Sequence, residues 1–226
     1  MTTIAANLQD VRERLSAACQ AAGRSPSSVQ LLAVSKSFGP EAVAQAFDAG
    51  QRAFGENYIQ EAMRKIDALR HLALEWHCIG PIQANKTRLV AQNFDWVQSL
   101  DRLQIAQRLS TQRPAEMAPL QVCIQVNIDG GTNKSGVAPQ DALALARQVA
   151  GLPRLRLRGV MCIPEPSADF AMAVAVHRQA KALFDHLTVH GLSLDTLSLG
   201  MSADLEAAVR AGSTMVRVGT AVFGQR

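Results

Sequence analysis

The sequence contains eight short runs rich in apolar and β-forming residues, each separated from the next by a segment of helical character. In chain order these runs cover residues 29–35, 52–57, 74–80, 96–101, 121–129, 155–164, 196–202 and 214–223. The segment after the first run has a proline near its start, Pro40, and a glycine at its end, Gly50, as helices often do. Strict alternation of strands and helices predicts parallel strands joined by right-handed crossovers.

Eight strand–helix units favour a closed (β/α)8 TIM barrel, an α/β fold in which apolar parallel strands are covered by helices. An amphipathic helix over about residues 4–22 precedes the first strand, so we expect a barrel with an extra N-terminal helix. An open doubly wound sheet is the structural alternative. The sequence has no linker or low-complexity stretch, and residues 1–226 are predicted to form a single domain.

Composition and charge exclude several classes of protein. The formal net charge is +4, but basic residues are scattered among acidic ones, so nucleic acid is not an expected partner. The cysteines stand singly, without the C-x-x-C spacing of zinc or redox sites, and no metal site is predicted. The N-terminus has no secretory signal pattern and no apolar run is long enough to span a bilayer. We therefore expect a cytoplasmic protein that does not bind membranes.

Functional groups of TIM barrels gather at the carboxyl ends of the strands. The predicted strand ends are more polar than the strand bodies and supply Lys36, Glu56, Asn57, Gly80, Asp101, Asn127, Met161, Met201, Ser202 and residues 217–220. This set of residues is the candidate site.

Lys36 is the most informative of these residues because it follows seven mostly apolar positions. A lysine at such a place is either a surface group whose stem lies on apolar neighbours or a desolvated amine. Desolvation lowers the pKa of an ammonium group, and only the neutral amine attacks a carbonyl. Lys36 is therefore a candidate for forming a Schiff base.

The last two strands indicate an anion site. In TIM barrels the loops after strands seven and eight are a recurrent phosphate site. Ser202, Gly219 and Thr220 supply hydroxyl groups, free N–H groups and close backbone approach there. The structural alternative is that the glycines only ease closure of the barrel. Together with Lys36, the pattern points to a phosphorylated carbonyl compound.

Arg217 lies two residues before Gly219, so a period of two places both on the same side of the last strand. An arginine pointing into the mouth of a barrel needs an acceptor, because a buried unpaired charge is costly. The acceptor is either a pyridine nitrogen or a carboxylate such as that of Glu56.

Several motifs resemble one family along essentially the whole chain. They cover residues 32–36 (LAVSK), 54–58 (FGENY), 76–80 (WHCIG), 83–86 (QANK), 126–128 (VNI), 158–161 (RGVM), 199–204 (LGMSAD) and 212–224. In these motifs the chain is similar to the pyridoxal-phosphate homeostasis protein family, which is related to the barrel domain of bacterial alanine racemases. The chain departs from the family at Cys78, Leu199 and Gly131. The last lies in the loop before Lys134, a lysine that we expect to be solvated rather than bound to an anion.

The resemblance implies a fold-type III barrel that binds pyridoxal 5′-phosphate (PLP). It implies cofactor-binding roles for Lys36, Asn57, Met161, Ser202, Arg217, Gly219 and Thr220. Lys36 would hold PLP as a Schiff base, and the residues after strands seven and eight would hold its phosphate. Arg217 would meet the pyridine nitrogen, with Asn57 against the cofactor and Met161 beside the ring. No residue is assigned a catalytic role.

Three functions remain open. The family resemblance favours a PLP carrier or buffer in vitamin B6 and amino-acid homeostasis, monomeric and with PLP-dependent apoenzymes as recipients. A PLP-dependent amino-acid racemase is the alternative, and a cofactor-free Schiff-base lyase is a third. Racemases of this fold need a second base, usually a tyrosine from an added C-terminal domain, whereas the only tyrosine here is Tyr58 after the second strand. An arginine also leaves the pyridine nitrogen unprotonated, which weakens the electron sink. We therefore expect no robust catalysis.

Overall fold

The structure is a computed structural model that describes residues 3–131 and 134–224. Its strands run parallel in the order β1 to β8, and β1 pairs with both β2 and β8, so the sheet is closed. The strands are β1 (Gln30–Val34), β2 (Ala53–Glu56), β3 (Glu75–Cys78), β4 (Trp96–Leu100), β5 (Leu120–Val126), β6 (Leu155–Cys162), β7 (Thr196–Ser198) and β8 (Met215–Val218). The TIM barrel is confirmed, and the open sheet is wrong.

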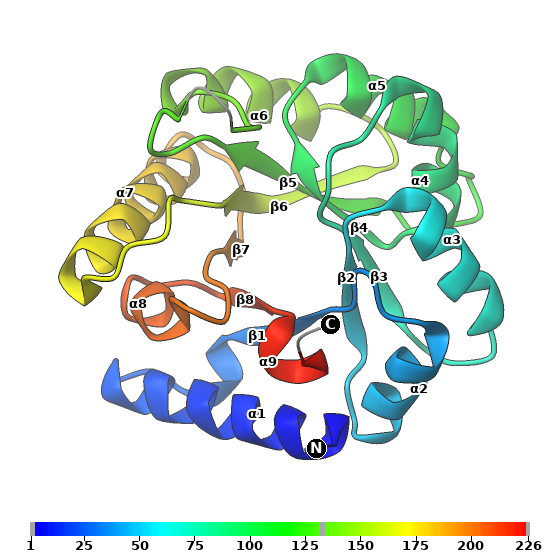
Figure 1. Ribbon diagram of the computed structural model, residues 1–226. Helices are drawn as coiled ribbons and strands as arrows, with labels where there is room; N and C mark the ends of the chain where they lie inside the picture. Colours follow the sequence, from blue (N-terminus) through cyan, green and yellow to red (C-terminus); the bar gives the residue numbers. More distant parts are fainter. Residues whose placement is uncertain (1–2, 132–133, 225–226) are drawn as a thin grey trace.

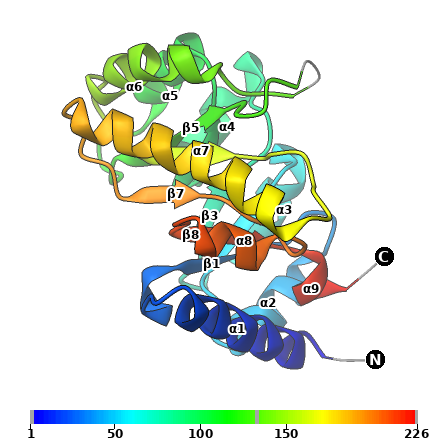
Figure 2. The ribbon, with the colours of Figure 1, turned by 90° about the vertical axis from the view of Figure 1, so that its left-hand side faces the viewer.

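Helices surround the strands (Figure 1). They are α1 (Ile4–Ala21), α2 (Pro40–Asp48), α3 (Ile59–Ala68), α4 (Thr87–Asn93), α5 (Leu103–Gln112), α6 (Ala142–Ala150), α7 (Phe170–Val189), α8 (Leu205–Arg210) and α9 (Thr220–Phe223), with short 3-10 turns at Pro26–Ser28, Ala84–Lys86 and Pro139–Asp141. Figure 2 shows α7, α8 and α1 covering one side of the barrel. None of the described helices is long and apolar enough to cross a bilayer.

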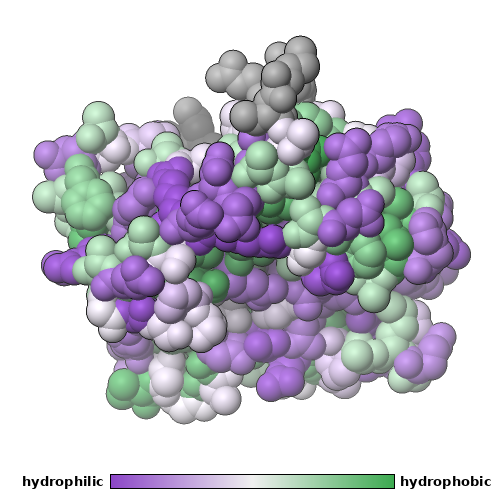
Figure 3. Space-filling view, turned by 90° about the horizontal axis from the view of Figure 1, so that it is seen from below, coloured by the Kyte–Doolittle hydropathy of each residue, from purple (hydrophilic) through white to green (hydrophobic). Residues whose placement is uncertain are grey.

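The extra helix α1 begins one residue after its cap, Thr3, whose side chain accepts a hydrogen bond from the N–H of Ala6. Its apolar stripe, which includes Leu8, Val11 and Leu15, is buried against α8, α9 and α2. The molecular face seen from below in Figure 1, where α1 lies, mixes hydrophilic and hydrophobic residues (Figure 3). The sequence pattern of α1 is therefore that of a helix with one face on the barrel.

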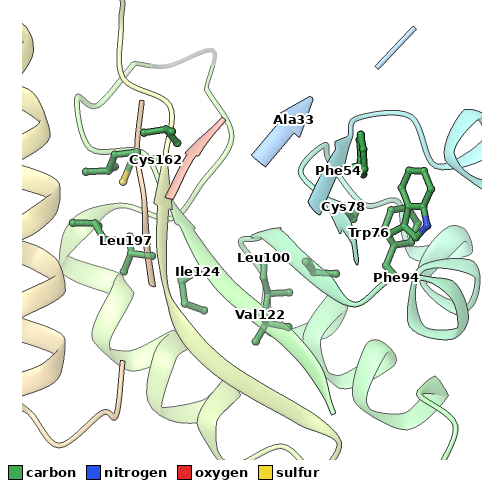
Figure 4. Packing of buried hydrophobic residues seen from close by; sticks show 14 of the residues in the cluster. Ala33, Phe54, Trp76, Cys78, Phe94, Leu100, Val122, Ile124, Cys162 and Leu197 are labelled. Carbon is green, nitrogen blue, oxygen red and sulfur yellow. The ribbon is translucent and has the colours of Figure 1, made fainter. Parts of the chain in front are cut away.

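Alternation along the strands divides the apolar residues into two layers. On β1, Leu31 and Ala33 belong to the large cluster between strands and helices, whereas Leu32 and Val34 belong to a cluster inside the barrel. Figure 4 shows part of the outer layer, where the side chains of Phe54, Trp76, Phe94 and their neighbours pack together. Both layers are close-packed, so the mouth at the strand ends is the place where a ligand finds room.

The last predicted strand, residues 214–223, is too long. Strand β8 stops at Val218, and residues Thr220–Phe223 form the short helix α9. The N–H groups of Val222 and Phe223 both donate to the carbonyl oxygen of Gly219. The chain turns there because β8 has reached the mouth of the barrel, beyond the last paired residues of its neighbours β1 and β7.

Candidate functional site

A cavity of about 680 Å³ opens at the carboxyl ends of the strands, between the ends of β1, β2, β3, β6, β7 and β8. Six of the seven predicted cofactor-binding residues line it: Lys36, Asn57, Ser202, Arg217, Gly219 and Thr220. These residues are up to 184 positions apart in the chain, since 220 − 36 = 184. The barrel brings them together because every strand runs in the same direction.

Lys36 lies two residues beyond the end of β1 and is exposed at the cavity. Its Nζ makes no hydrogen bond or ion pair with any described residue. The preceding residue, Ser35, is fully buried. Lys36 as a whole is therefore exposed in this structure, and its role in forming a Schiff base stays a prediction.

Four backbone N–H groups lie directly after β7 and β8 among residues that line the cavity, and we call them the N–H cradle. They belong to Ser202, Ala203, Gly219 and Thr220, and none of them donates a hydrogen bond to a described residue. A Cβ at Gly219 would lie 3.1 Å from the carbonyl oxygen of Val34, closer than ordinary packing allows. Unpaired N–H groups of this kind bind anions such as phosphate.

The loop after β7 is held in shape by Asp204. Its carboxylate accepts the N–H of Met201 at 2.7 Å and contacts Nε2 of His177 at 2.9 Å. Burial acts to raise the pKa of the Asp204 carboxyl, but hydrogen bonds from His177 and the Met201 N–H outweigh it, so this pKa is lowered. Asp204 therefore stays ionised and keeps the loop in the conformation that leaves its N–H groups free.

Helix α1 braces both halves of the N–H cradle. Arg14 donates to the carbonyl oxygen of Ser202 at 2.7 Å and forms a two-pronged ion pair with Glu206 of α8, with one contact of 2.6 Å. Asn7 donates to the carbonyl oxygen of Val222 in α9 at 2.9 Å. The extra helix thus connects the loop after β7 with the loop after β8.

Arg217 lines the cavity and is 4% exposed. Its Nη1 donates to the carbonyl oxygen and the hydroxyl of Ser198, and its Nη2 donates to the carbonyl oxygen of Cys162 at 2.8 Å. Burial lowers the pKa of Arg217 to about 10, so the guanidinium is charged at neutral pH. Its Nε–H has no acceptor among the described residues. The alternative partner Glu56 is wrong, because Glu56 binds Lys65 instead.

A chain of hydrogen bonds inside the barrel supports Arg217. The Ser198 hydroxyl donates to Oε1 of Gln98 at 2.7 Å, and Nε2 of Gln98 lies 2.9 Å from Nδ1 of His77. Nε2 of His77 lies 2.7 Å from Glu75, so His77 is a hydrogen-bonded histidine of the core. Sequence reasoning missed Gln98 and Ser198. The signal that could have found them is a polar residue at an inward position of an otherwise apolar strand.

Asn57 and Met161 differ in their placement. Asn57 lines the cavity, and its Oδ1 is buried without a hydrogen-bond partner among the described residues. A Cβ at Gly80 would collide with the backbone of Asn57, so this glycine permits the close approach of two strand ends. Met161 is fully buried inside the barrel with Trp96 and Cys123 and does not line the cavity. The proximity of Met161 to a bound ring stays a prediction.

A smaller cavity of about 190 Å³ adjoins the first and is lined in part by Lys134. The expectation that Lys134 is solvated is wrong, because its Nζ lies 2.7 Å from Asp129 and 3.1 Å from Glu165. Burial acts to lower the pKa of Lys134, but these two carboxylates outweigh it and the pKa is raised. Its amine is therefore engaged, whereas that of Lys36 is free.

Three of the apolar residues that line the larger cavity were not predicted from the sequence. Ile79 and Ile163 line it from the ends of β3 and β6, and Phe38 lines it from the segment after β1, stacked 5.2 Å from the ring of Phe223. They supply apolar walls of the kind that small-molecule sites usually have. In the described part of the chain, no group of three or more histidine, cysteine, aspartate or glutamate residues is placed to hold a metal ion.

Comparison with known proteins identifies the family. The sequence profile of the family "Alanine racemase, N-terminal domain" matches residues 4–226. The pyridoxal phosphate homeostasis protein of Escherichia coli (strain K12) is 54% identical over 229 residues, which cover 100% of this chain and 98% of the relative. That of Pseudomonas aeruginosa is 56% identical over 226 residues, covering 100% and 97%. The chain belongs to the pyridoxal phosphate homeostasis protein family.

A solved relative carries the cofactor. The structure of PipY from Synechococcus elongatus PCC7942 with PLP bound is 36% identical to this chain, with a TM-score of 0.85 and coverage of 98% of this chain and 100% of PipY. The family resemblance drawn from the sequence motifs is therefore confirmed, as is the relation to the barrel domain of alanine racemases.

Proposed function

We propose that this chain binds PLP in the larger cavity, holds it through a Schiff base on Lys36 and acts as a PLP carrier or buffer. The observation that carries the proposal is the combination of an unpaired lysine amine and an N–H cradle in one cavity. The family and the PLP-bound relative PipY support the choice of ligand.

The residues of the cavity fit PLP group by group. A fully ionised phosphate only accepts hydrogen bonds, and the N–H cradle and the hydroxyls of Ser202 and Thr220 can donate them. The pyridine nitrogen accepts a hydrogen bond, and the Nε–H of Arg217 is unused among the described residues. Asn57 has a buried carbonyl oxygen in need of a donor. The apolar walls suit the faces of an aromatic ring.

Each residue then has a distinct task. The Nζ of Lys36 would hold the aldehyde carbon as a Schiff base, with loss of water, the N–H cradle and Ser202 would hold the phosphate, and Arg217 would hold the far end of the ring. When bound, PLP can withdraw electrons from an attached amine. Arg217 keeps its own proton at neutral pH, because its pKa is about 10, and so leaves the ring nitrogen as an acceptor. This arrangement favours holding PLP over using it.

The cavity offers little to a racemase. Among its described lining residues, Lys36 and Arg217 are the charged ones, and the tyrosine Tyr58 is 59% exposed and lies outside the lining. Two-base racemisation needs a second proton carrier on the opposite face of the ring. We therefore propose a monomeric carrier that passes PLP to PLP-dependent apoenzymes and has no robust catalysis of its own.

The direct test of the proposed function is a titration of the purified chain with PLP. We expect the absorbance of a Schiff base to develop at a stoichiometry of one and to be bleached by borohydride. Peptide mapping by mass spectrometry should then find the reduced pyridoxyl group on Lys36. A pyridoxyl group on Lys134, the lysine of the neighbouring cavity, would contradict the assignment.

The N–H cradle predicts a strong preference for the phosphorylated aldehyde. Ser202→Ala should weaken PLP binding by about 10- to 150-fold, since a charge-assisted hydrogen bond contributes about 1.5–3 kcal/mol. Pyridoxal, which lacks the phosphate, should bind far more weakly than PLP and be insensitive to this substitution. Ser193→Ala, in an exposed residue before β7, is the matched control. Equal affinities for PLP and pyridoxal would exclude the cradle.

Absence of robust catalysis can be measured by hydrogen exchange. We expect L-alanine and L-serine, incubated with the PLP-loaded chain in deuterated water, to exchange their α-hydrogen only slowly. Loss of one of two bases costs about 10²–10⁴-fold in rate, or about 3–5 kcal/mol of barrier. NMR detects the exchange, and chiral chromatography detects racemisation. Racemisation at about one turnover per second or faster would show that the chain is an enzyme.

A further inference from the structure

A buried lysine that the proposed chemistry does not use lies beneath the segment of Lys36. Lys65, in the last turn of α3, is 2% exposed. Its Nζ lies 2.7 Å from Oε1 of Glu56 and 2.6 Å from Oε1 of Glu61. It also donates to the carbonyl oxygen of Ser35 at 2.7 Å. We call Lys65, Glu56 and Glu61 the buried charge cluster.

The buried charge cluster holds the chain on both sides of Lys36. On the N-terminal side of Lys36, the Ser35 hydroxyl donates to Glu56 at 2.5 Å, and the Ser35 carbonyl oxygen accepts from Lys65. On the C-terminal side of Lys36, the backbone N–H of Ser37 donates to Oε1 of Glu61 at 2.5 Å. Every member of the cluster therefore contacts a residue directly next to Lys36, while none of them contacts the Lys36 side chain.

The backbone at this point needs such support. Ser37 has a φ of 68°, in the left-handed region that a serine rarely adopts, and the N–H of Phe38 turns back to the carbonyl of Ser35 at 3.1 Å. This turn takes the chain out of β1 and directs Lys36 to the cavity. A conformation of this kind persists only where surrounding contacts determine it.

Stability alone does not account for the buried charge cluster. Taking charges out of water is costly, and well-packed apolar residues of similar volume are often as stable or more stable. Burial raises the pKa of the Glu56 carboxyl, and Lys65 and Ser35 only partly offset this effect. The raised pKa reflects the cost of removing the charged carboxylate from water. What charges supply, and apolar residues do not, is directional bonding to the backbone next to Lys36.

We propose that Lys65, with Glu56 and Glu61, is a positioning cluster that fixes the backbone around Lys36 so that its amine meets the aldehyde of the ligand. This inference rests on the proposed function, because it concerns the step in which Lys36 bonds to PLP. The cluster makes no hydrogen bond or ion pair with the N–H cradle or with Arg217. Its loss should therefore impair covalent attachment and spare the binding of the ring and phosphate.

The test compares two ligands that differ only at the reacting carbon. PLP has an aldehyde there, whereas pyridoxine 5′-phosphate has an alcohol and cannot form a Schiff base. The double variant Lys65→Met/Glu56→Gln removes the cluster without leaving a buried carboxylate unpaired. Glu61→Ala, in a partly exposed residue, removes the acceptor of the Ser37 N–H and is the second variant. Lys181→Met, which breaks an exposed pair with Asp185 on α7, is the control.

We expect the double variant to lose PLP affinity by about tenfold or more, because a small misplacement of a reacting group is costly, while pyridoxine 5′-phosphate affinity changes by less than about threefold. Glu61→Ala should show the same selective loss to a smaller degree, and Lys181→Met should show none. Circular dichroism checks that each variant is folded. If the double variant does not fold, the selective loss in Glu61→Ala decides.

Three other outcomes would count against these proposals in different ways. Equal losses for both ligands, or no loss for either, would overturn the positioning role and leave PLP binding on Lys36 intact. An unsubstituted chain that binds both ligands equally and forms no borohydride-stable adduct would instead overturn the proposed function, and this inference with it.

Discussion

Lys36→Ala is expected to abolish completely the covalent PLP adduct that is detected after borohydride reduction. The amine of Lys36 is unpaired among the described residues and is exposed at the cavity, so no other described group there can take its place in a Schiff base. Exposed side chains without partners contribute little to stability, and the free energy of unfolding should change by about 0.5 kcal/mol or less. Mass spectrometry of the reduced protein and chemical denaturation measure the two effects.

Lys134→Ala is the informative control for this experiment. Lys134 lines the neighbouring cavity, but its amine is held by Asp129 and Glu165. We expect the Lys134 variant to keep the adduct on Lys36. Retention of a full adduct by Lys36→Ala, together with its loss in Lys134→Ala, would reverse the roles of the two lysines.

Lys65→Met alone is expected to have the largest effect on stability. It leaves the carboxylate of Glu56 buried, with the Ser35 hydroxyl as its remaining hydrogen-bond donor among the described residues. Removal of one partner of a buried ion pair costs about 3–5 kcal/mol, a large part of the stability of an ordinary domain. Denaturant unfolding followed by circular dichroism measures the loss.

The loss should depend on pH in a defined direction. Burial already raises the pKa of Glu56 in the folded chain, and removal of Lys65 raises it further. A carboxyl whose folded pKa exceeds its unfolded value is destabilising above that unfolded value, and the penalty disappears as the pH falls and the group takes up a proton. The variant should therefore be closer to the unsubstituted chain at about pH 5 than at about pH 8.

A second substitution tests the cause. Glu56→Gln in the Lys65→Met background removes the buried charge, so most of the lost stability should return and the pH dependence should disappear. A loss below about 1 kcal/mol in Lys65→Met, or one that Glu56→Gln does not repair, would mean that the pair is not a buried charge pair in solution.

Local sequence patterns determined the fold and the general place of the site. Eight apolar runs alternating with helical segments are enough to predict a barrel, because each strand must be covered and each crossover has one hand. The strand ends then predict Lys36, Asn57, Ser202, Arg217, Gly219 and Thr220 as neighbours, and the structure brings these six to one cavity. Motif resemblance added the family and the ligand, which local patterns leave open.

Tertiary structure decided how far each strand reaches. Residues 219–223 look like a continuation of a strand, since apolar and small residues suit both states, but β8 ends at the mouth of the barrel and the chain turns into α9. Met161 lies in the barrel interior with Trp96 and does not line the cavity, and its expected place beside the ring stays a prediction. The period of two gives the side of a strand on which a residue lies, whereas the height along the barrel axis depends on how the strands are staggered.

Tertiary structure also decided which charges pair. From the sequence, Glu56 is a candidate partner of Arg217, and Lys134 is a solvated amine. In the fold, Glu56 binds Lys65 from the next helix, Lys134 binds Asp129 and Glu165, and Arg217 bonds to oxygens of two neighbouring strands. Sequence alone determined that these residues are charged and near strand ends. Their partners follow from contacts of 2.7–3.1 Å between groups that are far apart along the chain or in different segments, which only the closed barrel fixes.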